Sequence, residues 1–234
     1  MPKATIDSRL LAAQEAIDNA LSDAEIQGFL SQYGYNVARI GEGKAFFQTA
    51  PQLHQKQKAE YGDQFAATQA LEQAWEQANA EYMRLVKLAR IAFKSDLAAI
   101  TKLGLDGQRK ETISGWLTQA KQFYTNAIAD PAALASLGQY GLTAERLQAG
   151  QALMQQVETA NAAQQKEKGE AQQATLDRDA AFDKLDEWLG DFIAVARIAL
   201  EAKPQFLEKL GVLKLNQPRT GTQAEVPEET GVPA

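Results

Sequence analysis

The sequence predicts an all-α protein made of two similar helical-bundle units in tandem, packed with pseudo-two-fold symmetry. Three observations lead to this fold class. Ala, Gln, Glu, Leu and Lys dominate and runs of β-branched residues are absent, which favours helices over strands. Apolar residues recur at spacings of three and four, the period of a helix. Residues 19–104 also recur, without a gap, 107 positions later.

The internal repeat is clearest between residues 32–43, QYGYNVARIGEG, and residues 139–150, QYGLTAERLQAG. A period of this length is too long for a solenoid repeat and indicates a duplicated small domain. We therefore expect one unit over residues 1–108 and a second over residues 109–215, sharing one continuous core. Residues 216–234 are rich in Pro, Gly, Thr and Glu, and we expect a flexible, disordered tail there.

Each unit begins, in this interpretation, with a helix over residues 8–21 or its equivalent. Asp23 is placed to cap a short second helix, and in the other copy Asp130 is followed by proline, which suits a first helical position. Gly34 and Gly141 are natural C-terminal stops for this helix. A long helix is then expected over residues 36–61 and 143–168.

Gly62 and Gly169 follow the long helix, and two interpretations of them are open. We favour the tip of a helical hairpin, with a strongly amphipathic return helix that ends near residue 94 or 201. The alternative is one continuous helix through a tolerated glycine, roughly 90 Å long at about 1.5 Å per residue. A final short helix is expected over residues 96–103 and 204–210, so each unit would have five helical segments.

The retained residues Arg90 and Arg197 are the most interesting candidates for a site. If the chain turns at its glycine, residues equidistant from the turn face one another, which places Arg90 beside Tyr33 and Arg197 beside Tyr140. We interpret these as structural inter-helix contacts, in which a guanidinium caps helix carbonyls and packs on tyrosine. A pair of anion sites is the alternative.

Arg39 and Arg146 are a second retained pair. They are expected to form ion pairs or hydrogen bonds that set the register between helices. These are predictions of geometry and not of chemistry.

No catalytic, cofactor or metal site is predicted, and we expect the protein not to be an enzyme. The chain has no cysteine and one histidine, His54, whose equivalent in the other copy is Asn161. A di-metal carboxylate bundle needs Glu-x-x-His pairs, and His54 follows Pro51 at that spacing. Residues 41–47, GEGKAFF, lack the spacing of a phosphate-binding loop.

Charge and hydropathy limit the partners. The formal net charge is −6 and no basic block is present, so we expect no nucleic acid. The chain has no apolar run of membrane-spanning length and no evident secretory signal, so we expect no stable membrane insertion. The absence of cysteine fits a reducing, cytoplasmic location.

Three functions remain open at this point. We favour a non-enzymatic soluble scaffold that binds an unknown protein partner or itself. A small-molecule or lipid-binding bundle is the alternative, and it requires an apolar pocket of at least roughly 300 Å³ between helices. A membrane-active protein that opens a helical hairpin ranks below both.

Overall fold

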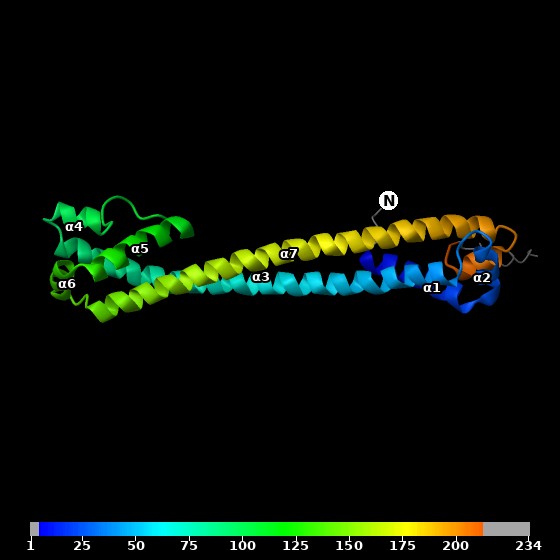
Figure 1. Ribbon diagram of the computed structural model, residues 1–234, viewed down its shortest axis with the longest axis horizontal. Helices are drawn as coiled ribbons and strands as arrows, with labels where there is room; N and C mark the ends of the chain where they lie inside the picture. Colours follow the sequence, from blue (N-terminus) through cyan, green and yellow to red (C-terminus); the bar gives the residue numbers. More distant parts are fainter. Residues whose placement is uncertain (1–4, 213–234) are drawn as a thin grey trace, which may run out of the picture. The chain divides into compact units, whose positions relative to one another are not determined.

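The computed structural model describes residues 5–212 and forms eight helices, with no strand in that part of the chain (Figure 1). The first four helices are α1 (Ile6–Ser22), α2 (Ala24–Ser31), α3 (Val37–Ala92) and α4 (Leu97–Lys102). The other four are α5 (Ile113–Ala129), α6 (Pro131–Gly138), α7 (Ala144–Ala199) and α8 (Pro204–Lys209). The prediction of an all-α fold is confirmed. The predicted tail, residues 216–234, lies outside the described residues.

Local chemistry explains where the short helices begin and end. The Asp23 carboxylate accepts hydrogen bonds from the backbone N–H groups of Glu25 and Ile26, which caps α2. Gly34, at φ 85°, takes the left-handed conformation that ends this helix, and Gly141, at φ 74°, does the same after α6. The predicted caps and stops of the two short helices are therefore confirmed.

The helices of the first half (residues 5–108) and the second half (residues 109–212) match in position. Each of α5 to α8 begins and ends 107 residues after its counterpart among α1 to α4. The paired lengths are 17, 8, 56 and 6 residues. The 107-residue period of the sequence thus reappears in the secondary structure.

The predicted hairpins at Gly62 and Gly169 are wrong. Both glycines lie inside continuous helices of 56 residues, so each half has four helices and not five. Neither glycine has a positive φ, and a Cβ added at either would meet no atom within 4 Å. An interior glycine destabilises a helix by only about 1 kcal/mol, which the flanking helix-forming residues offset.

The long helices do not turn back. The compact units of the structure therefore have other bounds than the two repeat units of the sequence, residues 1–108 and 109–215. Unit 1 comprises Met1–Pro51 and Ala180–Ala234, and unit 2 comprises Gln52–Asp179. Within unit 1, α1, α2 and the start of α3 pack with the end of α7 and with α8. Within unit 2, the end of α3 and α4 pack with α5, α6 and the start of α7. Each unit therefore combines segments from both halves of the sequence.

The described residues include two clusters of buried side chains, one in each compact unit. The unit 1 core is centred on the fully buried side chains of Ile17, Ile26, Leu30, Tyr35 and Phe192. The unit 2 core is centred on Tyr82, Leu85, Trp116, Phe123 and Tyr124. Tyr82 contacts the rings of Trp116, Phe123 and Tyr124 with centroids 5.7–6.1 Å apart, so these four rings form an aromatic cluster within this core.

Gly43 and Gly150, which are equivalent in the repeat, each leave room for an aromatic ring. A Cβ added at Gly43 would lie less than 3.0 Å from three ring atoms of Trp188, within unit 1. A Cβ added at Gly150 would lie less than 3.0 Å from three atoms of Tyr124, within unit 2. At both positions the absence of a side chain allows a large ring to lie against the helix backbone.

Candidate functional site

Arg90, in the last turn of α3, binds the linker between α4 and α5 (residues 103–112). Its Nε donates to the backbone carbonyl of Leu105 at 2.8 Å, and its Nη2 donates to that of Gly107 at 3.1 Å. All three residues belong to unit 2, whereas Tyr33 belongs to unit 1. The pairing of Arg90 with Tyr33 was derived from the hairpin, and the structure gives Arg90 these other partners.

Arg146 and Arg39 occupy equivalent positions but have different partners. The Nε of Arg146 donates to the Glu81 carboxylate at 2.9 Å, which joins α7 to α3 in unit 2. The Arg39 guanidinium lies 4.2 Å from the centroid of the Tyr35 ring in unit 1, a cation–π contact. Arg39 is exposed and Arg146 is half-buried, and of the two only Arg146 forms an ion pair between two helices.

Tyr33 and Tyr140 are exposed, with 51% and 43% of their surfaces accessible. Arg197 lies in the last turn of α7 and is also exposed. Within residues 5–212 it has no hydrogen bond or ion pair to another side chain. The structure therefore does not bring Arg197 and Tyr140 together in one compact unit, because Arg197 belongs to unit 1 and Tyr140 to unit 2.

Sequence reasoning missed two polar clusters that join the halves, which we call the clamps. In unit 1, Asn19 donates to the backbone carbonyl of Lys209 at 2.6 Å, and the Lys209 ammonium binds the Asp23 carboxylate at 2.9 Å. The clamp of unit 2 has the same three residue types, with identical roles: Asn126, Asp130 and Lys102. Identity at the 107-residue offset was the signal that could have found them.

The clamps lower the pKa values of their two aspartate carboxylates. Hydrogen bonding to the Lys209 ammonium, followed by the backbone N–H of Ile26, holds the pKa of Asp23 below its usual value. The Lys102 ammonium and the backbone N–H of Ala133 lower the pKa of Asp130 in the same way. Each aspartate therefore caps a helix and binds a lysine from the other half of the chain.

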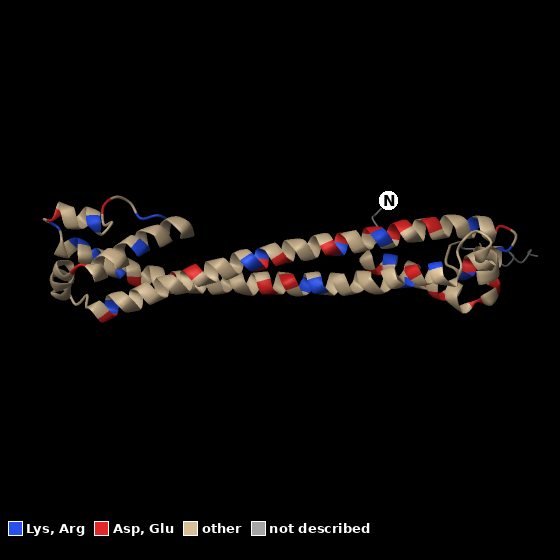
Figure 2. Cartoon of the chain, in the orientation of Figure 1, with Lys and Arg blue, Asp and Glu red and all other residues tan. Residues whose placement is uncertain are grey.

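The long helices α3 and α7 lie side by side over part of unit 2. We call it the central span: residues 57–76 of α3 and residues 152–178 of α7. Arg178 donates to the Gln57 side chain at 2.9 Å, and Thr175 lies 3.5 Å from the Tyr61 hydroxyl, so the two helices run antiparallel. Figure 2 shows acidic and basic residues along both long helices.

Large apolar side chains are exposed on the central span. Phe65 is 73% exposed, Leu176 is 62% exposed and Tyr61 is 48% exposed. The residues at the matching repeat positions are all polar, being Gln172, Gln69 and Lys168. In each of these three equivalent pairs only one residue is apolar. The repeated fold therefore does not require an apolar residue at these positions.

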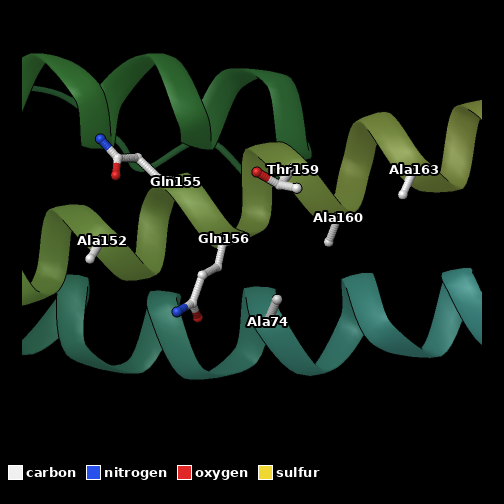
Figure 3. Close-up of a pocket in the computed structure, with 7 residues that line it drawn as sticks. All are labelled: Ala74, Ala152, Gln155, Gln156, Thr159, Ala160 and Ala163. Carbon is white, nitrogen blue, oxygen red and sulfur yellow. The ribbon is translucent and has the colours of Figure 1, made fainter.

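Open grooves also lie on the central span. The larger one, about 570 Å³, lies between α3 and α7. Its walls are mainly small or amide side chains, namely Ala74, Ala152, Gln155, Gln156, Thr159, Ala160 and Ala163. Figure 3 shows Gln156 extending from α7 toward α3, on which Ala74 lies. A second groove of about 280 Å³ is lined by Phe65 and by polar residues of α3.

A cluster of carboxylates lines a further groove of the central span. Oxygen atoms of Glu60, Glu167 and Glu170 lie within 4.8 Å of one another, at a spacing that can ligate a hard cation such as Ca²⁺. The Lys166 ammonium lies 3.1 Å from Glu167 and 2.9 Å from Glu170, and these carboxylates raise the pKa of Lys166. Part of the negative charge is thus already balanced, and the absence of a metal site stays a prediction.

The chain matches no known protein family, no curated protein and no solved structure. No helix among residues 5–212 combines the length and apolar character needed to cross a membrane. The function is therefore inferred from the accessible surface of the central span.

Proposed function

We propose that this protein is a non-enzymatic helical scaffold that binds a partner protein along the central span. The observation that carries the proposal is the exposure of Phe65, which lines a groove on α3, and of Leu176 on the paired helix α7. Exposed aromatic and aliphatic side chains next to a groove are typical of the anchor residues of protein interfaces.

The form of the larger groove supports a helical occupant. Four of its seven lining residues are alanines, so the backbone of a partner helix could approach α3 and α7 closely. Amphipathic helices bind such grooves through apolar residues spaced three and four positions apart. Gln155, Gln156 and Thr159 add hydrogen-bonding groups that would fix the register of the partner.

A small molecule or lipid is the second candidate occupant. The volume of about 570 Å³ exceeds the roughly 300 Å³ that such a ligand needs. Five of the seven lining residues are exposed, however, so the groove would leave most of a small apolar ligand in water. Binding sites for such ligands bury most of the ligand surface, and the groove therefore supports a protein partner better.

The proposal also includes a duplication of the repeat unit and a cytoplasmic location of the protein. Tandem duplication of a 107-residue unit, with pseudo-two-fold symmetry, is supported by the matching helix bounds and by the two clamps of identical residues. A cytoplasmic location is supported by a composition without cysteine.

A photo-crosslinking residue placed at Phe65 tests the proposed surface in cells that make the protein. We expect it to capture a discrete partner, and we expect the same residue at Gln148, an exposed polar position on α7, to capture none. Leu176→Ser, added to the chain that carries the crosslinking residue at position 65, should reduce the capture without lowering the melting temperature, because this side chain is exposed. Equal capture at Phe65 and Gln148 would refute this assignment of the surface.

A further inference from the structure

Several contacts that hold unit 1 together join the first half of the chain to the second. The clamp of Asn19 and Asp23 with Lys209 links α1 and α2 to α8. Phe29 packs against Phe206 with ring centroids 6.4 Å apart, and Arg9 binds Asp186. The surface between the halves is therefore an internal interface with the character of one between two subunits.

This interface distinguishes one half from the other. In unit 1, Trp188 lies against Gly43, stacks on Phe192 at a centroid distance of 5.1 Å and meets the edge of Tyr35. The first-half residue equivalent to Trp188 is Glu81, which binds Arg146 in unit 2. A first half paired with another first half would thus place a carboxylate where unit 1 has an indole. The clamps of both units join a first half to a second half, so each half carries the surface that the other half binds.

We infer that a second copy of this chain can supply the complementary half. Two chains would then exchange halves and form a dimer in which each unit takes its segments from both chains, as in domain swapping. The contacts between the helices of each unit would not change, since the same residues meet. Only the linker between Leu103 and Thr112 would change, and its ten residues span at most about 35 Å when extended.

The hydrogen bonds of the linker control the fraction of chains that exchange halves. Arg90 donates to its Leu105 and Gly107 carbonyls, while Gln119 accepts from the Lys110 N–H and donates to the Gln108 carbonyl. These bonds fold the linker against unit 2 and keep the effective concentration of the attached half high. The chain is therefore monomeric when dilute, and it exchanges halves when concentrated chains fold together.

Cross-linking between single-cysteine variants tests the exchange, because the natural chain has no cysteine. Full-length Asp23→Cys and Lys209→Cys proteins are mixed, unfolded in urea, refolded together at high concentration and treated with a short bis-maleimide. We expect a covalent dimer that contains both variants. The matched control mixes Asp23→Cys with Lys102→Cys, both in the first half, and should give only collisional background.

Two further measurements keep the test decisive. Arg90→Ala, which frees the linker, should raise the dimer fraction of the refolded, cysteine-free protein several-fold in light scattering. The double variant Asp23→Cys/Lys209→Cys, refolded when dilute, should cross-link within one chain and so report correct folding. Intrachain cross-linking of the double variant, with no excess dimer in the mixture over its control, would overturn the inference.

Discussion

Gly43 offers the sharpest test of how unit 1 is packed. The Trp188 ring lies against this glycine, and a Cβ there would come within 3.0 Å of three ring atoms. The ring cannot easily move aside, because it stacks on Phe192 with planes 9° apart and contacts Tyr35 edge-on. Gly43→Ala should therefore displace a rigid aromatic cluster.

The expected size follows from two opposing effects. Overpacking of a filled core destabilises a protein by about 1–3 kcal/mol. Alanine in a helix interior is about 1 kcal/mol more favourable than glycine. The net loss for Gly43→Ala should thus reach about 2 kcal/mol. Gly41 lies two residues away in the same helix with no atom within 4 Å of an added Cβ, so Gly41→Ala should be stabilising.

Urea unfolding followed by far-ultraviolet circular dichroism measures both changes. Trp188→Leu should itself be destabilising, but in that background Gly43→Ala should become neutral or stabilising, because the smaller side chain leaves room for the Cβ. If Gly43→Ala is as stable as Gly41→Ala in the natural background, the close packing of Trp188 on α3 is refuted.

Three other outcomes are expected. Gly62→Ala and Gly169→Ala should each raise stability by about 1 kcal/mol in urea unfolding, since both positions are helical and open; destabilisation by either would contradict the continuous helices. The lowered pKa values of Asp23 and Asp130 mean that these carboxylates contribute stability above the unfolded pKa, near 4, which is lost as pH falls through the lower folded pKa. The melting temperature of the natural protein should thus fall in acid, and that of Asp23→Asn/Asp130→Asn should fall less steeply. Parallel curves of melting temperature against pH for the two proteins would exclude a contribution from these carboxylates. Cleavage of a protease site inserted at residues 106–112 should leave the two fragments together in gel filtration, and separate elution would show that the halves do not hold each other.

The positions of the helices followed from the sequence because they depend on local chemistry. Asp23 caps α2 through neighbouring N–H groups, and Gly34 ends it by its own backbone conformation. Pro131 similarly stands in the first turn of α6. None of these features requires knowledge of what the helix packs against.

The pairing of the long helices could not be predicted in the same way. The apolar stripe around Tyr82 and Leu85 would face a core in a hairpin or in the observed arrangement, since periodicity marks a buried face and not its partner. The choice depends on steric fit between distant residues, such as Trp188 against Gly43. One signal was available: Trp188 aligns with Glu81, so the two halves are not interchangeable.

The candidate site was hidden for the same reason. Phe65 and Leu176 have the character of core residues, but both are exposed in the structure. Their repeat equivalents, Gln172 and Gln69, are polar, which argues against a shared role in the core. Arg90 was identified as a residue that binds carbonyls, but its partners in the linker depend on how the chain continues after α4.

The central claim is that each compact unit is built from both halves of the chain, and cross-linking within single dilute molecules tests it most directly. Two double variants are compared, Asp23→Cys/Lys209→Cys and Asp23→Cys/Lys102→Cys, each treated with a short bis-maleimide and assayed for intrachain cross-links. The structure predicts rapid cross-linking of the first pair, because Lys209 binds Asp23 at 2.9 Å. Preferential cross-linking of the second pair would mean that the first half closes on itself, which would contradict units built from both halves.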